Sequence, residues 1–517
     1  MLNADHLDSL SAPHLREVNR DLAEQIAQYQ QQAEAYQREI LFKSTRIEQL
    51  TYERARFKRI RFDRTSEKLD RTQASLLEEA LDEDLCALEE ELEQLQPTPP
   101  AKSEKSKPRR EPLPDHLPRV EIPHEPGSTT CGCGCQMKRI GEDVAEKLHY
   151  TPGEFTVERH VRGKWVCAKC EKLVMAPVPA QVIDKGVATP SLLAQVMVAK
   201  YADHTPLYRQ EEIFGRAGYA IPRSTLGEWV GVCGVRLQPL VDALRGAVLG
   251  HSVLHADETP VAMLKPGNGK THRAYLWAYS PGAFEDTKAV IYDFTETRSG
   301  KNAEEFLGAW RGKLVCDDYS GYKAMLAKDG VTECGCLAHA RRKFFDLHEA
   351  NKSQIAADAL KLFGQLYEVE REVQDLDAQA RREVRQAKAK PIADTLHAWM
   401  TAHRLKVPDG SATAKALNYS LGRWQALTRY LDDGTLPPDN NYIENRIRPI
   451  AIGRSNWLFA GSLRAGQRAA AIMSLIQSAR LNGIDPYAYL ENVFERLPTL
   501  PASRIEELLP HRWTPAA

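Results

Sequence analysis

The chain has 517 residues, 43% of them hydrophobic, and a formal net charge of −1. This length suggests several domains, and the apolar content is ample for folded cores. The sequence has no run of about eighteen apolar residues, and its N-terminus is polar and acidic, so we expect neither a transmembrane helix nor a signal peptide. Acidic residues concentrate in 72–101 and arginines in 445–484, so the total charge says nothing about partners.

Residues 15–57 carry apolar side chains at alternating steps of three and four, which form one stripe on a helix. One seam position reads Ile26, Ala33, Ile40 and Ile47, and its partner position reads Leu22, Tyr29, Tyr36, Lys43, Leu50 and Phe57. Such a stripe needs a partner helix. Two partners are open: a second copy of the chain, which we favour, or the acidic helix expected at 72–96 in an intramolecular hairpin.

A basic run, RARFKRIRFDRTSEK, follows the heptad stripe. Arg59 and Arg61 in this run are predicted to contact DNA phosphates, with a solvated helix face as the alternative. Residues 97–118 hold seven prolines and form a linker with no means of packing. We therefore predict an N-terminal helical or coiled-coil module with a basic segment over 1–96, and a Pro-rich linker over 97–118.

Five of the ten cysteines fall in two groups, CGCGC and CAKC, around a strand-like stretch with a turn at Pro152-Gly153. In a long chain without a secretion signal, such groups indicate metal binding rather than disulfides. Structural zinc takes four tetrahedral thiolate or imidazole ligands. We predict a zinc-ribbon-like domain over 119–180, in which Zn²⁺ is held by Cys131, Cys135, Cys167 and Cys170. Cys133 is a rival ligand, because CxCxC offers three candidates for two places.

Residues 181–250 have the pattern of a helical bundle segment, and the pattern changes at residue 251. From there, strand-like and helical runs alternate as β-β-β-α-β-α-β, the order of a ribonuclease H-like fold. We predict the first part of this core over 251–345, a helical insertion over 346–435, and the helix of Glu444 with C-terminal helices over 436–517. The whole chain is expected to be a multidomain α+β protein whose α/β core carries the chemistry.

Three acidic residues stand at the ends of strand-like runs or inside an Arg-rich helix: Asp257 in HADETP, Asp317 in LVCDDYSGY and Glu444 in DNNYIENRIRP. In the expected fold the first strand ends beside the fourth, which makes Asp257 and Asp317 neighbours, and Glu444 can face them from its helix. Mg²⁺ (or Mn²⁺) takes carboxylate oxygens, and two such ions activate a nucleophile and stabilise a leaving oxygen. We therefore predict that the three carboxylates form a two-metal phosphoryl-transfer site.

The arginines after Glu444 are interleaved with aromatic residues and glycines. Arginine pairs with phosphate in bidentate fashion, and an aromatic ring can stack on a displaced base. We predict DNA contacts from Arg446, Arg454, Asn456 and Trp457. Simple packing is the alternative for Trp457.

Taken together, these stretches resemble a DDE-type transposase of the bacterial insertion-sequence-66 family, over nearly the whole chain. The motifs that carry the resemblance are FKRIRFDRTSEKLD, RHVRGKWVCAKC, KYADHTPLYRQEEIFGRAG, HADETPV, DDYSGY, CLAHARRKF and ENRIRPIAIGRSNWLFAGS. The resemblance implies that Asp257, Asp317 and Glu444 are the catalytic triad. Asp318 stands where the family often has glycine, so it is a rival for the metal. CLAH, with Cys336 and His339, resembles a C-x-x-H pattern of such transposases. Two ligands alone do not make a metal site, and we expect this pair to orient the neighbouring strand.

The resemblance also implies an activity: binding of the element's terminal inverted repeats, their cleavage, and joining of 3′-hydroxyl ends to target DNA. It implies DNA as the main partner, a homo-oligomer formed through the N-terminal helix, accessory proteins of the same element, and no membrane. The expected location is the bacterial cytoplasm, at the nucleoid. Two alternatives stay open: a non-catalytic zinc-ribbon and coiled-coil DNA-binding protein with an inactive core, and a structure-specific nuclease of the same fold.

Overall fold

The computed structural model describes residues 12–62, 71–95, 112–151, 153–264, 271–327 and 330–515. It divides into two compact units. The first comprises Met1–Lys68 and Asp84–Arg110, and the second comprises Leu69–Glu83 and Glu111–Ala517. No helix in the described ranges is long and apolar enough to cross a membrane.

The first unit is built on one long helix, α2 (Ala12–Phe62), together with the later residues of α3 (Arg71–Leu95). The predicted seam side chains on α2 are open to solvent: Ile26, Tyr29, Tyr36, Ile40 and Ile47 are between 56% and 69% exposed. An intramolecular hairpin would cover them. Within the described residues, the seam therefore lacks the partner that its sequence pattern requires.

The cysteine-rich part of the second unit is a small sheet. Its strands are β1 (Arg119–His124), β2 (Met137–Thr151), β3 (Glu154–Cys167) and β4 (Leu173–Met175), in the order β1-β3-β2 with β4 also paired to β3. The predicted hairpin is confirmed as β2 and β3, which reverse at Gly153, a glycine with φ +96°. Because Met137 pairs with Cys167, both cysteine groups lie at the open end of this hairpin.

Three helices follow, as the apolar periodicity predicts: α4 (Pro190–Tyr201), α5 (Leu207–Arg216) and α6 (Arg223–Leu249). The first is capped by Thr189, whose side chain accepts a hydrogen bond from the backbone N–H of Leu192. Their buried side chains join those of the central sheet and of the C-terminal helices in one hydrophobic core.

The central sheet has five strands in the order β7-β6-β5-β8-β9. The elements are β5 (Val253–Leu264), β6 (Thr271–Pro281), β7 (Ile291–Thr295), α7 (Gly300–Leu307), β8 (Gly312–Val315), α8 (Lys323–Leu326), β9 (Val331–Cys334) and α9 (Leu337–Asn351). The first three strands are antiparallel neighbours, whereas β8 and β9 run parallel to β5. The predicted element order is confirmed. β5 lies in the middle of the sheet, and its first four residues are buried.

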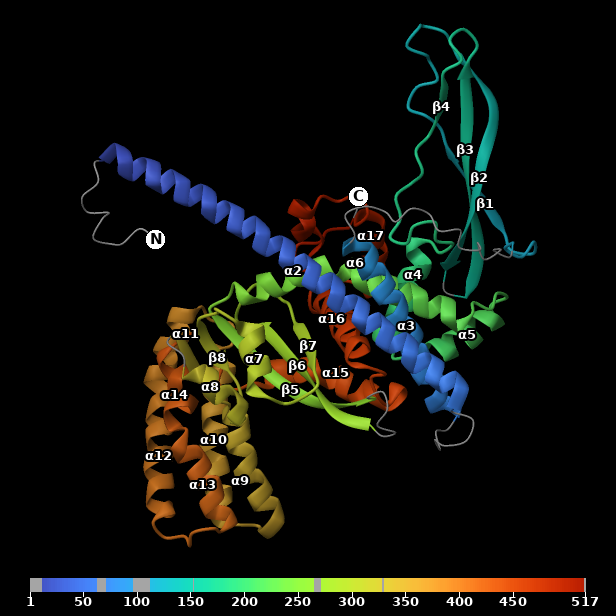
Figure 1. Cartoon of the computed structure of the whole chain (residues 1–517). Coiled ribbons are helices and arrows are strands. Elements are labelled where there is room, and N and C mark those ends of the chain that lie inside the picture. The colour runs from blue at the N-terminus through green and yellow to red at the C-terminus, as the bar shows by residue number, and fades with distance from the viewer. Residues whose placement is uncertain are drawn as a thin grey trace. The chain divides into compact units, whose positions relative to one another are not determined.

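The insertion is helical, as expected, with α10 (Gln354–Val373), α11 (Ala378–Val384), α12 (Lys390–Arg404), α13 (Ala412–Gly422) and α14 (Trp424–Asp432). Together with α9 these helices form a bundle beside the sheet (Figure 1). The bundle has its own apolar core, centred on residues such as Phe344, Phe363 and Leu417, and that core also takes in Val315 of β8. The insertion is therefore packed onto the strand that leads to Asp317.

The chain ends in α15 (Asn441–Trp457), α16 (Leu463–Leu481) and α17 (Pro486–Arg496). α15 lies against β5, and α16 lies along the edge strand β7. The hydroxyl of Ser474 accepts the backbone N–H of Tyr292 at 2.8 Å, and the hydroxyl of Ser478 accepts that of Val290 at 3.0 Å. Two serines of a helix thus satisfy backbone donors that a further strand would otherwise pair with.

Candidate active site

Strand register places Asp257 and Asp317 side by side. β5 and β8 are parallel and pair Val253 with Lys313, Leu254 with Leu314 and His255 with Val315. Asp257 and Asp317 lie two residues beyond the last of these pairs and keep the same offset. β5 continues to Leu264, so Asp257 lies within its strand and not at the strand end that the sequence predicted, whereas Asp317 lies just past the end of β8. The shared offset sets Asp257 level with Asp317 where β8 stops.

Glu444 comes from the first turn of α15, the helix that lies against β5. The pKa of Asp257 is raised to about 8, mainly by burial and then by the neighbouring charges of Glu258, Asp317 and Glu444. Asp317 and Glu444 therefore both lie close enough to Asp257 to oppose its ionisation. These effects put the three predicted carboxylates in one electrostatic neighbourhood, although among the described residues their oxygens do not form a group within 4.8 Å of one another.

Asn440 links the segments that carry these acids. Its side chain is fully buried, and its Nδ2 donates to the carbonyl of Ala256 at 2.9 Å. Its Oδ1 lies 2.7 Å from Nδ1 of His255, and its backbone N–H donates to Sγ of Cys336 at 3.2 Å. Since Oδ1 can only accept, His255 donates through Nδ1. Burial lowers the pKa of His255 to about 4, so the ring is neutral.

The carboxylate of Glu258 is engaged by Arg298 and Tyr322, although its charge also acts on Asp257. The Glu258 carboxylate accepts hydrogen bonds from Nε of Arg298 at 2.8 Å and from the hydroxyl of Tyr322 at 3.0 Å. The guanidinium of Arg298 lies 3.8 Å from the ring centroid of Tyr319, whose hydroxyl donates to the carbonyl of Arg298. Glu258 therefore holds the loop that follows Asp317 against β5.

Asp318, the rival for the metal, is paired with an arginine. Nε of Arg423 lies 3.4 Å from Oδ1 of Asp318, and Nη2 of the same arginine donates to the carbonyl of Asp317 at 3.2 Å and to Glu333. Arg423 comes from the junction between α13 and α14 in the helical insertion. The sequence pattern gave no sign of this contact, because about a hundred residues separate the partners along the chain.

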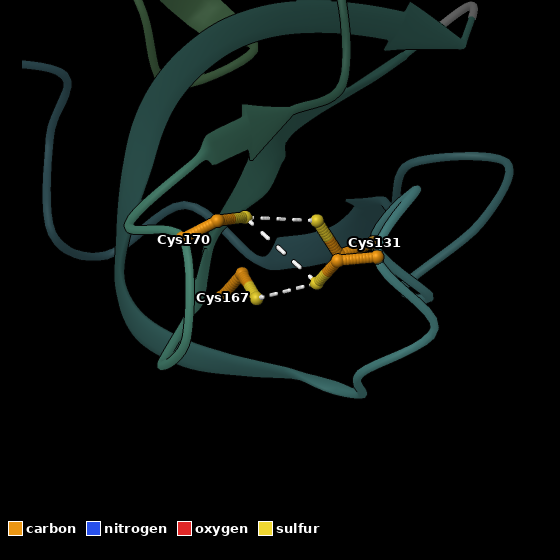
Figure 2. Close-up of side chains that lie close together, drawn as sticks. Cys131, Cys167 and Cys170 are labelled. Carbon is orange, nitrogen blue, oxygen red and sulfur yellow. Dashed lines mark hydrogen bonds between the residues drawn. The ribbon is translucent and has the colours of Figure 1, made fainter.

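The cysteine centre differs from the predicted ligand set. Cys131, Cys133, Cys167 and Cys170 offer sulfur atoms that all lie within 4.8 Å of one another, and Cys135 is not among them. Sγ of Cys131 is 3.1 Å from Sγ of Cys170, and Sγ of Cys133 is 3.6 Å from Sγ of Cys167. Figure 2 shows Cys131, Cys167 and Cys170 turned toward one another at this end of the hairpin. The choice of Cys135 over Cys133 is therefore wrong.

A tight turn explains the correction. The backbone N–H of Gly134 donates to the carbonyl of Cys131 at 2.8 Å, and Gly134 has φ +82°. The turn folds Cys133 back beside Cys131 and sends Cys135 on toward the strand. Hydrogen bonds from the backbone N–H groups of Cys170 and Lys169 lower the pKa of the Cys167 thiol to about 6, which favours the thiolate that zinc requires.

The predicted DNA contacts on α15 divide into two groups. Arg446 lies over the ring of Tyr442, 3.6 Å from its centroid, and Arg454 donates to the carbonyl of Pro260 at 2.6 Å. Trp457 packs against the main core. Asn456, in contrast, is exposed. The side chains of Arg59 and Arg61 lie outside the described residues.

Only Asn456 of an exposed stripe on α15 was named by the sequence analysis. Asn445, Arg448, Ile452 and Asn456 are all exposed, whereas Ile443, Ile447 and Ile450 are buried. The spacing of the exposed positions keeps them on one helix face, which begins directly after Glu444. The buried isoleucines recur with the helical period, so the sequence indicates which face of this helix is buried and which is exposed.

Comparisons with known proteins identify the class of protein to which the chain is related. The protein-family model described as Transposase IS66 family matches residues 185–468, more than half of the chain. Three further descriptions match: IS66 C-terminal element at 474–511, zinc-finger binding domain of transposase IS66 at 128–171, and Transposase C of IS166 homeodomain at 49–122. The chain is thus related to transposases along most of its length.

Two curated relatives come from Sinorhizobium fredii. Uncharacterized protein y4jD is 37% identical over 416 residues, which cover 78% of this chain and 81% of the relative. Uncharacterized protein y4qI is 38% identical over 428 residues, which cover 80% of this chain and 79% of the relative. The chain belongs to the IS66 transposase family. Its zinc-finger and homeodomain matches imply that it binds DNA.

Proposed function

We propose that this protein is a DDE-type DNA transposase with a ribonuclease H-like catalytic core. One observation carries the proposal: in a chain of the IS66 family, Asp257 and Asp317 share the register offset of β5 and β8, and the charges of Glu258, Asp317 and Glu444 add to burial in raising the pKa of Asp257. The strand order β7-β6-β5-β8-β9, with the last two strands parallel to β5, supports the fold.

The donor set fits divalent cations. A buried Asp257 whose ionisation is opposed by neighbouring carboxylates is a costly arrangement unless a cation binds among them. Carboxylate oxygens are the ligands that Mg²⁺ prefers, and Mn²⁺ accepts them as well. Asp257, Asp317 and Glu444 would hold these ions. Bound there, Mg²⁺ would activate the attacking oxygen and stabilise the leaving oxygen during phosphoryl transfer.

The surrounding residues position the three acids. Asn440 ties the strand of Asp257 to the helix of Glu444, and Glu258 holds the loop that follows Asp317 through Arg298 and Tyr322. The pairing of Asp318 with Arg423 favours Asp317 as the metal ligand.

The other parts of the chain would assemble the complex. The four-cysteine group suggests structural Zn²⁺, which would fix the open end of the β2–β3 hairpin. We propose that this domain and the N-terminal module bind the terminal inverted repeats. The open seam of α2 would pair two copies of the chain, because two element ends must be held together. Accessory proteins of the same element are further proposed partners.

An assay with labelled element ends tests the activity. The wild-type protein with Mg²⁺ is expected to cleave the ends and to join them to target DNA. Asp257→Asn is expected to bind ends without cleaving them. Asp318→Asn is the matched control and is expected to keep cleavage, because Asp318 is engaged by Arg423. Binding without cleavage by the wild type would favour a non-catalytic DNA-binding protein, and cleavage without joining would favour a nuclease.

A further inference from the structure

A second group of potential metal ligands lies beside the candidate active site. Within the described residues, Cys336, His339 and Glu444 offer one sulfur, one nitrogen and one oxygen that all lie within 4.8 Å of one another. Sγ of Cys336 is 3.2 Å from Nδ1 of His339, and Nδ1 of His339 is 3.6 Å from Oε1 of Glu444. The sequence supplied only the first two of these ligands, and the fold adds the third.

The spacing of these atoms suits one ion. Zinc binds cysteine sulfur at about 2.3 Å, and histidine nitrogen or carboxylate oxygen at about 2.0–2.2 Å, in tetrahedral geometry. Those bond lengths separate neighbouring ligand atoms by roughly 3.3–3.6 Å, close to the two distances observed. A simple hydrogen bond explains the contact of Cys336 with His339. That hydrogen bond does not account for Oε1 of Glu444, which is buried without a hydrogen-bond partner among the described residues.

Burial raises the pKa of the Cys336 thiol to about 12, whereas two neighbouring features favour its thiolate form once a cation binds. This residue is the N-cap of α9, a helix of fifteen residues, so its sulfur lies at the positive end of the helix dipole. The backbone N–H of Asn440 points at the same sulfur at 3.2 Å. Hydrogen bonds of this kind orient ligands and stabilise the charge of a bound thiolate.

We propose that Cys336, His339 and Glu444 bind a transition-metal ion, Zn²⁺ by their chemistry, at a centre distinct from the four-cysteine site. The mixed sulfur, nitrogen and oxygen set suits zinc and is poor for Mg²⁺, which prefers oxygen alone. Three protein ligands leave the fourth position open, as in zinc sites that also bind water or substrate. Oε1 of Glu444 would serve this centre, which leaves Oε2 for the carboxylate site next to Asp257.

Metal content tests the proposal on the full chain. Protein purified in the presence of Zn²⁺ and excess Mg²⁺, then freed of loose ions by gel filtration, is analysed by elemental mass spectrometry. The proposal expects two zinc ions per chain in the wild type and one in Cys336→Ser or His339→Asn. Cys334→Ser is the matched control, because this buried thiol lies two residues away and outside the ligand group. It is expected to keep two.

A cobalt measurement keeps the test decisive if one variant folds poorly. In a Cys167→Ser/Cys170→Ser background, Co²⁺ is expected to give a thiolate charge-transfer absorption that disappears on adding Cys336→Ser. His339 is only partly buried, so His339→Asn is the milder variant. One zinc ion in the wild type would overturn the proposal, as would two that persist in both Cys336→Ser and His339→Asn. Neither readout depends on DNA cleavage, so failure here leaves the proposed transposase activity standing.

Discussion

Replacing Asp257 with asparagine removes a buried carboxyl group and keeps its size. In the folded chain the pKa of Asp257 is about 8, compared with an ordinary 3.8. Because the folded pKa is raised, the stability linked to this group is complete below about pH 4 and is lost as the pH rises toward about 8. A shift of roughly four units corresponds to at most about 6 kcal/mol, since each unit is worth about 1.4 kcal/mol. Asparagine does not ionise, so the Asp257→Asn variant does not lose this stability as the pH rises.

Thermal unfolding in magnesium-free buffer measures the effect. Asp257→Asn is expected to unfold at a higher temperature than the wild type at pH 9. The amount by which its free energy of unfolding exceeds that of the wild type should be larger at pH 9 than at pH 6 by about 2–3 kcal/mol. Added Mg²⁺ should then stabilise the wild type, by about 2.7 kcal/mol at one hundred times its dissociation constant, and leave Asp257→Asn unchanged.

The control for this experiment is Asp318→Asn, whose carboxylate is partly exposed and paired with Arg423. It should show no growing advantage with pH. The reasoning fails if Asp257→Asn is no more stable than the wild type at pH 9, or if Mg²⁺ stabilises both proteins equally. Either result would mean that Asp257 does not stand in a cluster of opposed negative charges.

Four further predictions concern separate parts of the chain. Asn440→Ala leaves buried polar groups without their hydrogen-bond partner, so it should lower the free energy of unfolding by on the order of 3 kcal/mol. It should also lower kcat, while DNA affinity in a gel-shift assay stays unchanged. Ile40→Asp should halve the mass observed by sedimentation, because a charge on the open α2 seam blocks helix pairing. Cys133→Ser should lose zinc measured by elemental analysis, whereas Cys135→Ser should keep it. Arg448→Ala should weaken DNA binding and reduce the slope of log affinity against log salt by about 1, and an unchanged slope would remove Arg448 from the interface.

Local patterns in the sequence were sufficient for the core elements. The continuous apolar run in HRAYLWAYS and the short run LVCDD mark strands, and their pairing into a sheet is what sets Asp257 level with Asp317. The exposed seam of α2 was likewise readable, because a heptad stripe is a property of one helix alone.

The remaining details depend on contacts between distant segments. Arg446 and Arg454 were assigned to DNA because of their charge, but Tyr442 and the carbonyl of Pro260 engage them. The number of arginines in a helix does not say which face packs on a strand. Cys135 was chosen over Cys133 without knowledge of the turn at Gly134, whose left-handed backbone decides which sulfur faces the centre.

The serines that α16 presents to β7 have a consequence for assembly. With Ser474 and Ser478 occupying the backbone donors of Tyr292 and Val290, these two donors are not available to a neighbouring molecule's strand. At the opposite border, the N–H of Gly335, just past β9, is bonded to the carbonyl of Ala426 in α14. We therefore expect the proposed pairing of copies to run through helices and side chains, with no strand added at these positions.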